Sequence, residues 1–400
     1  MTTYNFDKIT NRKGTNCLKY DFAVERGKPA DVLPLWVADM DFPVSEEITK
    51  SLHAAVDHGI YGYTQPKDAY YNAVMNWMER NHNWKTEREW IVKTPGVVFA
   101  LGAAVKAFTD PGDAILIQNP VYYPFTNIIR DNDRRVVDNT LIYEKTAGQS
   151  GDNGYRIDFE DFERKLEQEH IKLFILCNPH NPVGRVWTVE ELQKLGEICL
   201  RHHVIVVSDE IHNDFVYPGY EHTVFATVDP RFAEFTVTCT APSKTFNLAG
   251  LQISNIFIPN EKLRKAFQTE IDKTGYDEPN ALGIVACEAA YRAGEDWLDQ
   301  LRTYLLKNLN FLRNFLQEKI PQIHLVEPEG TYLVWLDCGE LGITGKELDQ
   351  FIVDKAGLWL DGGSMFGPSG AAFQRVNIAC PQATLELALN KLKAAVDNLE

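Results

Sequence analysis

The sequence of 400 residues lacks a segment long and apolar enough to cross a membrane. Its longest nearly apolar stretch, residues 96–107, contains Lys106 and is too short to span a bilayer as a helix. The opening residues show no basic region followed by an apolar one, so we expect no signal peptide. These absences predict a cytoplasmic protein with no membrane partner.

Closely spaced cysteines are lacking as well. The seven cysteines include no Cys-x-x-Cys pair and no zinc-knuckle spacing. We therefore expect reduced, mostly buried thiols of the kind found in cytosolic proteins, and no metal site. The adjacent His202 and His203 leave this expectation unchanged, because no third ligand falls at a metal-site spacing in the sequence.

Positive charge is scarce relative to negative charge. Lys and Arg number 40 against 56 Asp and Glu, which gives a formal net charge of −16. A surface this acidic repels phosphate backbones, so we expect no nucleic-acid partner. The remaining composition, 44% hydrophobic and 24% charged, is ordinary for a globular protein and excludes extensive disorder.

The middle of the chain alternates short apolar runs with helical patterns. This alternation is typical of an α/β fold, in which a parallel sheet is covered by helices on both faces. A capping-box pattern, Thr188-Val-Glu-Glu191, marks the start of one such helix. The apolar runs that we expect to be strands are residues 114–117, 173–177, 204–207, 236–239 and 253–258.

The last third of the chain predicts a smaller α+β domain. Long amphipathic helices are expected at residues 296–315 and 383–399, with short strands at 332–336 and 373–379 between them. Residues 148–154, rich in glycine, are the best candidate for a surface loop. We divide the chain into an N-terminal segment (1–47) that packs with the small domain, a large domain (48–290) and a small C-terminal domain (291–400).

Polar side chains directly follow three of the expected strands. Asn181 comes after residues 173–177, Asp209 after residues 204–207 and Lys244 after residues 236–239. Ligands of open α/β sheets bind beyond the carboxyl ends of the strands. We therefore expect an amide, a carboxylate and an amine at one edge of the sheet.

A glycine turn adds a fourth group. Residues 91–98 are expected to form a strand that runs into a turn at Gly96, and a helical pattern follows from Val98. The first backbone N–H groups of a helix have no intrahelical partner and suit a phosphate.

These four groups match the chemistry of one cofactor. An amine bonds to an aldehyde, a carboxylate keeps a ring nitrogen protonated, an amide donates to a ring oxygen, and a helix N-terminus holds a phosphate. Pyridoxal 5'-phosphate carries all four partner groups, and its protonated ring accepts electrons from a substrate carbanion. The sequence therefore predicts an enzyme that uses this cofactor.

The same motifs resemble those of a known family. Asn-Pro-x-Asn-Pro-x-Gly, Asp-Glu-Ile-His and Ser-Lys-Thr-Phe-Asn-Leu-Ala-Gly, in this order, are similar to motifs of fold-type I pyridoxal-phosphate enzymes of the aminotransferase class I/II family. The likeness covers nearly the whole chain. It implies a large domain with a mixed, mostly parallel sheet between helices, and a smaller α+β domain.

The resemblance also implies roles for single residues. Lys244 would be the catalytic lysine bonded to the cofactor, Asp209 would pair with the ring nitrogen and Asn181 would donate to the ring hydroxyl. Arg375, in Gln-Arg-Val-Asn, would bind the substrate carboxylate with its bidentate fork. Tyr122 would stack on the ring and contact the substrate.

The resemblance further implies a homodimer whose sites are shared. Tyr63, in Tyr-Gly-Tyr-Thr, would reach across to the cofactor phosphate and substrate of the partner subunit. The site would then be complete only in the dimer.

Several residues depart from the pattern of ordinary aminotransferases. Ala241 and Gln252 stand where those enzymes usually carry a serine and an arginine for the phosphate, and His212 stands where they often carry a tyrosine. Together with Leu-Trp-Val-Ala-Asp-Met-Asp-Phe at residues 35–42, these choices are similar to the cystathionine β-lyase branch of C–S lyases. That branch implies α,β-elimination on sulfur amino acids, which yields a thiol, pyruvate and ammonia.

The departures also move the expected cofactor contacts. Thr240, Ser243 and the backbone of Val97 and Val98, after Gly96, become the expected phosphate contacts. His212 is then expected to lie against the cofactor.

Each assignment has a structural alternative. Lys244 alone reads as a surface lysine, Asp209 as a helix cap, Asn181 as a turn residue and Arg375 as a member of a surface ion pair. Core packing or a satisfied polar role is the alternative for three further side chains, Tyr122, Tyr63 and His212. A plain helix start is the alternative for the glycine turn at residues 96–98.

Other functions remain open to test. An aminotransferase shares the early chemistry and needs a keto acid, and a non-catalytic regulator on the same scaffold would turn over no amino acid. A hydrolase triad is rejected because no Gly-x-Ser-x-Gly turn exists. The lack of Gly-x-Gly-x-x-Gly after a strand weakens a dehydrogenase assignment.

Overall fold

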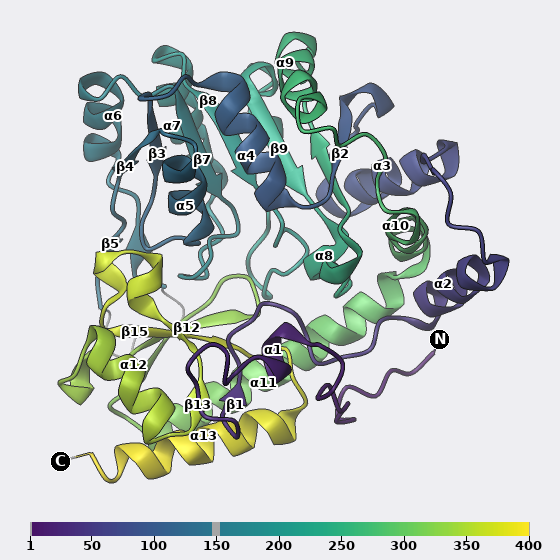
Figure 1. The fold of residues 1–400 in the computed structure, drawn as a ribbon. Helices are drawn as coiled ribbons and strands as arrows, with labels where there is room; N and C mark the ends of the chain where they lie inside the picture. The colour runs from purple at the N-terminus through teal and green to yellow at the C-terminus, as the bar shows by residue number, and fades with distance from the viewer. Residues whose placement is uncertain (1, 146–152, 400) are drawn as a thin grey trace.

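The computed structural model describes residues 2–145 and 153–399. The chain forms an upper part, drawn mainly in blue and teal, and a lower part that contains the yellow C-terminus (Figure 1). Of the surface loop expected at residues 148–154, only Asn153 and Gly154 fall within the described residues.

The upper part is built on a seven-stranded sheet. β10 is antiparallel to both of its neighbours, and the other strand pairs are parallel. The expected mixed, mostly parallel sheet is therefore confirmed. The strands, in order across the sheet, are β2 (Ile91–Thr94), β10 (Ser254–Phe257), β9 (Thr236–Thr240), β8 (Ile205–Asp209), β7 (Leu173–Cys177), β3 (Ala114–Ile117) and β4 (Arg135–Asp138).

Helices cover both faces of this sheet, and alternate strand residues point to opposite faces. In β3, Ile115 and Ile117 join the core under α4 (Val97–Phe108), α5 (Pro124–Asp131) and α9 (Glu261–Asp272). Ala114 and Leu116 join the core under α6 (Phe159–Gln168) and α7 (Val189–Arg201). A strand buried on both faces reads as a continuous apolar run, which is the signal seen in the sequence.

Local signals set the ends of several elements. The expected capping box forms at α7, where the Thr188 hydroxyl accepts from the Glu191 N–H and the Glu191 carboxylate accepts from the Thr188 N–H.

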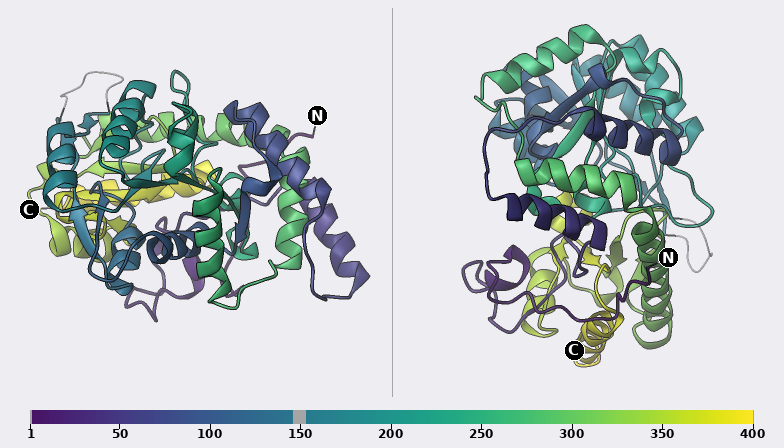
Figure 2. Two further views of the ribbon diagram at one scale, coloured as in Figure 1. Left: turned by 90° about the horizontal axis from the view of Figure 1, so that it is seen from above. Right: turned by 90° about the vertical axis from the view of Figure 1, so that its right-hand side faces the viewer.

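Three further helices, α2 (Glu46–His58), α3 (Asp68–His82) and α10 (Ala281–Ala293), pack together at the side of the upper part. Figure 2 shows them from above and from the right.

The lower part contains a four-stranded antiparallel sheet in the order β11-β12-β15-β14. The helices expected at residues 296–315 and 383–399 correspond to α11 and α13. The elements are β11 (His324–Val326), β12 (Leu333–Asp337), β14 (Asp361–Gly362), β15 (Phe373–Asn377), α11 (Glu295–Lys319), α12 (Gly345–Asp354) and α13 (Gln382–Val396).

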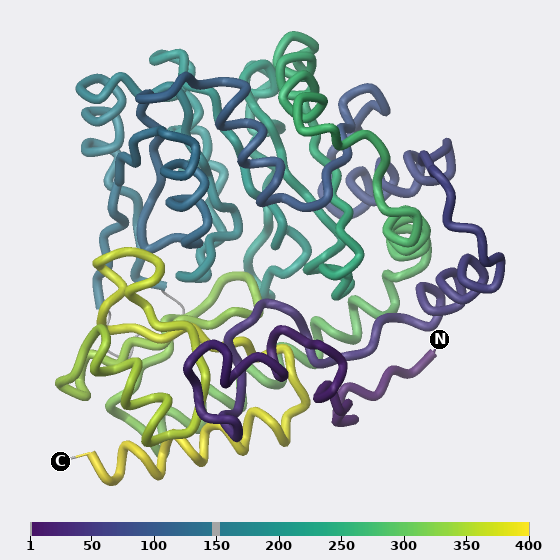
Figure 3. Tube along the Cα trace, in the orientation of Figure 1, coloured from purple at the N-terminus to yellow at the C-terminus, as the bar shows by residue number. Residues whose placement is uncertain are grey.

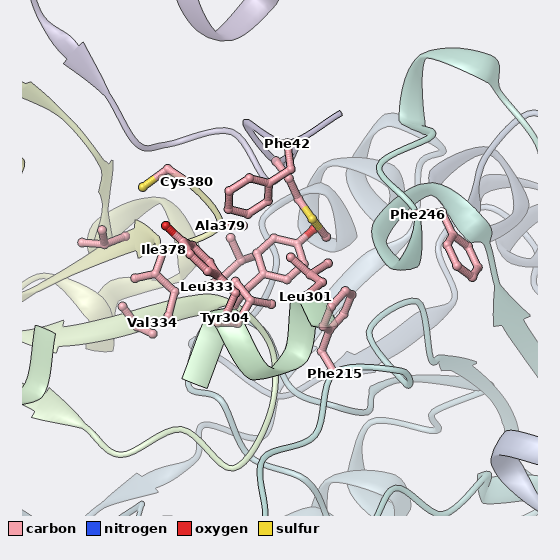
Figure 4. Packing of buried hydrophobic residues seen from close by; sticks show 14 of the residues in the cluster. Phe42, Phe215, Phe246, Leu301, Tyr304, Leu333, Val334, Ile378, Ala379 and Cys380 are labelled. Atoms are coloured by element: carbon pink, nitrogen blue, oxygen red, sulfur yellow. The ribbon is translucent and has the colours of Figure 1, made fainter. Parts of the chain in front are cut away.

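The N-terminal segment lies against this lower part. β1 (Leu33–Pro34) pairs in parallel with β13 (Leu358–Trp359), and the purple and yellow-green traces run side by side in Figure 3. Phe42 packs edge-on against Tyr304 of α11, with ring centroids 5.6 Å apart, in the core drawn in Figure 4. The exact domain boundaries at residues 47 and 290 stay a prediction.

The remaining elements are short. They are α1 (Leu18–Asp21), α8 (Pro242–Thr245), β5 (Ile142–Tyr143), β6 (Tyr155–Arg156) and the 3-10 helices at Arg88–Trp90, Phe225–Thr227, Phe232–Phe235, Ala249–Leu251, Gly339–Leu341, Gly363–Phe366 and Pro368–Gly370. Among the described residues, no helix combines the length and apolar character that a membrane crossing needs.

Candidate active site

A pocket opens where β7, β8 and β9 end. Helix α8 lies at this edge of the upper part, facing the lower part (Figure 1). The pocket is lined by Ala38, Pro95, Gly96, Val97, Val98, Tyr122, Cys177, Asn181, Asp209, Ile211, His212, Ser243, Lys244, Ala249 and Ile253. The polar side chains that follow three strands in the sequence therefore meet in one cavity.

Lys244 reaches the pocket from α8, the four-residue helix that follows β9. Its Nζ donates a hydrogen bond to the backbone carbonyl of Ala38 at 3.4 Å. Burial and the nearby positive charge of Arg375 lower the pKa of the Lys244 amine to about 8. A substantial fraction of this amine is therefore uncharged near neutral pH, unlike that of an ordinary lysine.

Asp209 ends β8 and is buried at the floor of the pocket. Its carboxylate accepts a hydrogen bond from the Ile211 N–H at 3.2 Å. Burial raises the pKa of Asp209 to about 7, although this hydrogen bond and the charge of Lys244 act in the opposite direction. Such a carboxylate gains stability from any cation that enters the pocket beside it.

Arg375 lies on β15 in the lower part, and its guanidinium reaches the same site. Nη1 donates to the side-chain oxygen of Asn181 at 3.0 Å, and Nη2 donates to the carbonyl of Trp36 at 3.0 Å and to the carboxylate of Asp361. The Nε–H of Arg375 is buried and has no partner within the described chain. An unpartnered buried donor of this kind suits an incoming anion.

The phosphate contacts expected around α4 lie at the pocket, with one exception. Gly96 precedes the helix, no side chain caps it, and the space where a Cβ would project from Gly96 is open. Ser243 and the backbone of Val97 and Val98 also line the pocket. Thr240 does not line the pocket, and its hydroxyl donates to the Asn255 carbonyl of β10 at 2.9 Å.

Three further expected residues have different surroundings. Tyr122 is half-buried at the pocket wall, and its N–H donates to the Asn181 carbonyl at 3.0 Å. His212 is buried beside Tyr332, and burial holds the pKa of His212 well below its usual value. Tyr63 is 95% exposed and does not line the pocket of its own chain.

Residues 35–42 form a strap that closes one side of the pocket, which sequence reasoning did not predict. Asn377 Nδ2 donates to the carbonyls of Val37 and Asp39 at 2.6 and 2.7 Å. Tyr332 donates to the carbonyl of Ala38 at 2.8 Å. The strap therefore presents a fixed carbonyl to Lys244, and no local signal in the sequence marks these contacts between distant residues.

Asn247 anchors the far end of the strap. Its side chain accepts from the Met40 N–H at 2.9 Å and donates to the carbonyls of Met40 and Phe42, each at 3.0 Å. Asn247 has a φ of 57°, a left-handed conformation that asparagine tolerates better than most residues. The asparagine of the Ser-Lys-Thr-Phe-Asn motif thus ties the lysine segment to the strap.

The two adjacent histidines have neighbours that their spacing did not reveal. Folding brings Glu163 and Glu167 of α6 beside His202, with potential ligand atoms within 4.8 Å of one another. These two carboxylates and His202 form a group of three potential ligands, which His203 does not join. Arg201 pairs with Glu163, so part of this acidic charge is already balanced.

Comparison with known proteins decides the family. Residues 30–392 match the family described as aminotransferase class I and II. The chain belongs to this family. Within the family, it is 47% identical over 392 residues to cystathionine beta-lyase PatB of Bacillus subtilis, covering 98% of this chain and 100% of that protein.

Solved structures of related enzymes share the fold. Cystalysin from Treponema denticola, whose crystal structure contains a pyridoxal 5'-phosphate cofactor, matches with a TM-score of 0.95 and 38% identity over 100% of both chains. The PLP-bound C–S lyase from Staphylococcus hominis matches with a TM-score of 0.91 and 35% identity, covering 99% of this chain and 98% of that chain. The expected membership in a fold-type I branch of C–S lyases is thus confirmed.

Proposed function

We propose that this protein is a pyridoxal-phosphate-dependent C–S lyase of the cystathionine β-lyase type. It cleaves sulfur amino acids by α,β-elimination to a thiol, pyruvate and ammonia. The observation that carries the proposal is the meeting of Lys244, Asp209 and Asn181 at one pocket, in a chain 47% identical to a cystathionine beta-lyase. Arg375 does not line this pocket, but it bonds directly to Asn181, which does.

The donor set fits the cofactor. Asp209 offers a carboxylate that gains from a ring cation, Asn181 offers a side-chain amide, and α4 offers uncapped N–H groups beside the open space at Gly96. Ser243 adds a hydroxyl. When bound, pyridoxal phosphate supplies an aldehyde for an amine and a protonated ring that accepts electron density from the substrate.

The ring would be held from its face and from the phosphate end. Tyr122 on the pocket wall offers an aromatic face for stacking, and His212 also lines the pocket, beside Tyr332. The N–H groups of Val97 and Val98 would hold the phosphate without a charged side chain, as helix N-termini do. The Thr240 hydroxyl already donates to the Asn255 carbonyl, so Thr240 would support the phosphate site only through its position in β9.

Lys244 is the proposed acid–base group. With a pKa of about 8, its Nζ is poised to accept the Cα proton of a substrate near neutral pH. The Ala38 carbonyl holds the free amine by a hydrogen bond. Proton transfer at the leaving sulfur can then use the proton that Nζ has gained.

Arg375 is the proposed site for the substrate α-carboxylate. Its Nη2 is fixed by Asp361 and by the Trp36 carbonyl, which leaves the Nε edge of the fork without a partner. A carboxylate at that edge would accept a charge-assisted hydrogen bond from the buried Nε–H. Asn181, bonded to Nη1, links this substrate contact to the cofactor contact.

A thiol-release assay tests the elimination activity. Protein loaded with pyridoxal phosphate is mixed with cystathionine in the absence of any keto acid, and pyruvate and free thiol are measured. The proposal expects both products in equal amounts. Amino transfer that requires a keto acid, with no thiol, would instead establish the aminotransferase alternative.

We also propose that the active form is a cytoplasmic homodimer. Exposed apolar side chains gather at Val56, Ile60, Tyr61 and Tyr63, and such clusters favour protein interfaces. Tyr63 is exposed and does not line its own pocket, which supports its entry into that of a second copy. All seven cysteines are free thiols, which supports a reducing compartment.

A further inference from the structure

Asp214 is a buried carboxylate that the proposed chemistry does not use. It is 3% exposed and does not line the pocket. Its Oδ1 accepts from Trp77 Nε1 at 3.2 Å and from His82 Nε2 at 3.0 Å, and its Oδ2 accepts from the Thr245 hydroxyl at 2.6 Å. Arg302 Nε donates to the Asp214 backbone carbonyl at 2.7 Å.

These donors come from three separate helices. Trp77 and His82 lie on α3, Arg302 lies on α11 and Thr245 is the last residue of α8. Burial alone would raise the pKa of Asp214, but hydrogen bonds from His82 and Thr245 and the charges of His82 and Arg302 bring it below the usual value. Asp214 is therefore an anion that links α8 to two long helices.

Helix α8 needs such a link. It has only four residues and no side-chain cap, and a single helical turn is unstable on its own. Thr245 directly follows Lys244, so the hydroxyl that meets Asp214 lies one residue from the reactive amine. We propose that Asp214 is a positioning residue that holds α8 through Thr245 and so fixes Lys244 Nζ in the pocket.

The proposal deepens the proposed function and rests on it for the role of Lys244. Asp214 touches neither the pocket nor Lys244 itself. Its effect must therefore pass through the backbone of α8. Catalytic groups lose rate steeply when misplaced by about 1 Å.

The decisive variants change Thr245 in the full-length protein. Thr245→Val keeps the shape and removes the hydroxyl, whereas Thr245→Ser keeps the hydroxyl. Thr236→Val is a matched control, because Thr236 is buried like Thr245 and its hydroxyl donates to the Phe232 carbonyl at 2.6 Å. Thr236 is the first residue of β9, at the end of the strand away from α8. In each case the variant loses or keeps one buried hydrogen bond that a threonine hydroxyl donates, to the Asp214 carboxylate from Thr245 and to a backbone carbonyl from Thr236.

Three measurements are made on each variant. The first is amide hydrogen exchange in a peptide that covers residues 242–248. The second is the rate at which added pyridoxal phosphate bonds to Lys244, followed by visible absorbance. The third is kcat and KM for cystathionine.

Thr245→Val is expected to speed exchange at residues 242–248 at least tenfold, slow cofactor bonding and lower kcat by about tenfold to hundredfold with KM nearly unchanged. Thr245→Ser is expected to recover most of each loss. Thr236→Val is expected to lower Tm by a similar amount and leave the other readouts alone. Equal effects of the two valine variants, or a Thr245→Val protein within twofold of wild type in all three readouts, would overturn the proposal.

A second variant tests the carboxylate itself. Asp214→Asn keeps the shape but removes the negative charge and turns one acceptor into a donor, so we expect a larger loss than with Thr245→Val. If wild-type protein binds pyridoxal phosphate but eliminates no thiol, the proposed function fails. The exchange and bonding measurements still test Asp214 in that case.

Discussion

Two titratable groups of the pocket have pKa values displaced toward each other. Burial lowers the pKa of Lys244 to about 8 and raises that of Asp209 to about 7. Keeping either side chain charged costs folding free energy when no ligand is bound. Such displaced pKa values are characteristic of groups that serve chemistry rather than stability. Burial also raises the pKa of the neighbouring Glu210 to about 8, but Glu210 does not line the pocket and accepts from the Ser208 hydroxyl and the Phe225 N–H.

This arrangement predicts that removing the Asp209 charge stabilises the cofactor-free protein. The carboxyl takes up a proton at about pH 7 when folded but at about pH 4 when unfolded. Below about pH 4 it is protonated in both states and costs nothing; the destabilisation grows as pH rises and is complete above about pH 7. Asp209→Asn is therefore expected to raise the free energy of unfolding by roughly 2–4 kcal/mol at pH 8, and by less at pH 5.

Urea unfolding of the cofactor-free wild-type and Asp209→Asn proteins at both pH values checks this prediction. Asp229→Asn is a suitable control, because Asp229 is only partly buried and is paired with Arg231. The same Asp209 variant should lose most of its elimination activity, since its amide cannot stabilise a ring cation. A variant no more stable at pH 8 than wild type would contradict the burial argument.

At the scale of single residues, the sequence allowed the polar contents of the pocket to be predicted but not their supports. Asn181, Asp209 and Lys244 each follow an apolar run, so chain order alone placed them at one edge. Asp361, which holds Arg375, and Asp214, which holds Thr245, act through contacts between segments far apart in the chain. No spacing or periodicity reports such pairs.

Among the elements, the strap at residues 35–42 connects the N-terminal segment to both halves of the site. Asn247 and Asn377 bind its backbone, and Arg375 binds the carbonyl of Trp36. Because the Ala38 carbonyl in this strap accepts from Lys244 Nζ, its position bears on the catalytic amine.

Asn247→Gly tests the strap. Glycine tolerates the left-handed φ of this position but makes none of the three strap hydrogen bonds. We expect faster hydrogen exchange at residues 35–42 and a fall in kcat/KM of roughly tenfold, as for a loosened catalytic group. Asn83→Gly, at a similar φ of 48° after α3, controls for the added backbone freedom.

Equal losses of kcat/KM in these two glycine variants would show that strap anchoring by Asn247 has no special role. Unchanged exchange at residues 35–42 in Asn247→Gly would lead to the same conclusion.

The elements themselves were largely predictable because burial on both faces leaves long apolar runs. The expected strands at residues 114–117 and 173–177 match β3 and β7 residue for residue. The antiparallel direction of β10 was not readable, since an apolar run carries no sign of its direction. The helix expected at residues 296–315 extends to Lys319, because its buried stripe continues at helical spacing from Leu312 to Leu316.

At the scale of the whole molecule, the proposed dimer predicts that activity depends on residues from two different subunits. Lys244 and Tyr63 are proposed to act in one site from two different subunits. Lys244→Ala and Tyr63→Ala homodimers should each have little activity. Mixed dimers should recover activity, because one of their two sites contains both natural residues.

Co-expression of the two variants with different affinity tags, followed by purification through both tags, provides the mixed dimer. Light scattering should give twice the 45.5 kDa mass of one chain. Recovery of about half the wild-type activity per dimer is expected. A mixed dimer as inactive as its parents would place Tyr63 outside the partner's site.

The covalent bond between Lys244 and the cofactor is the claim on which the rest depends. Pyridoxal phosphate is added to purified wild-type and Lys244→Ala proteins, visible absorbance is recorded, and the bond is reduced with borohydride before peptide mass spectrometry. We predict a visible band in the wild type that is lost in the variant, with the cofactor mass on the peptide containing Lys244. Labelling of a different lysine, or an unchanged band in Lys244→Ala, would contradict the account.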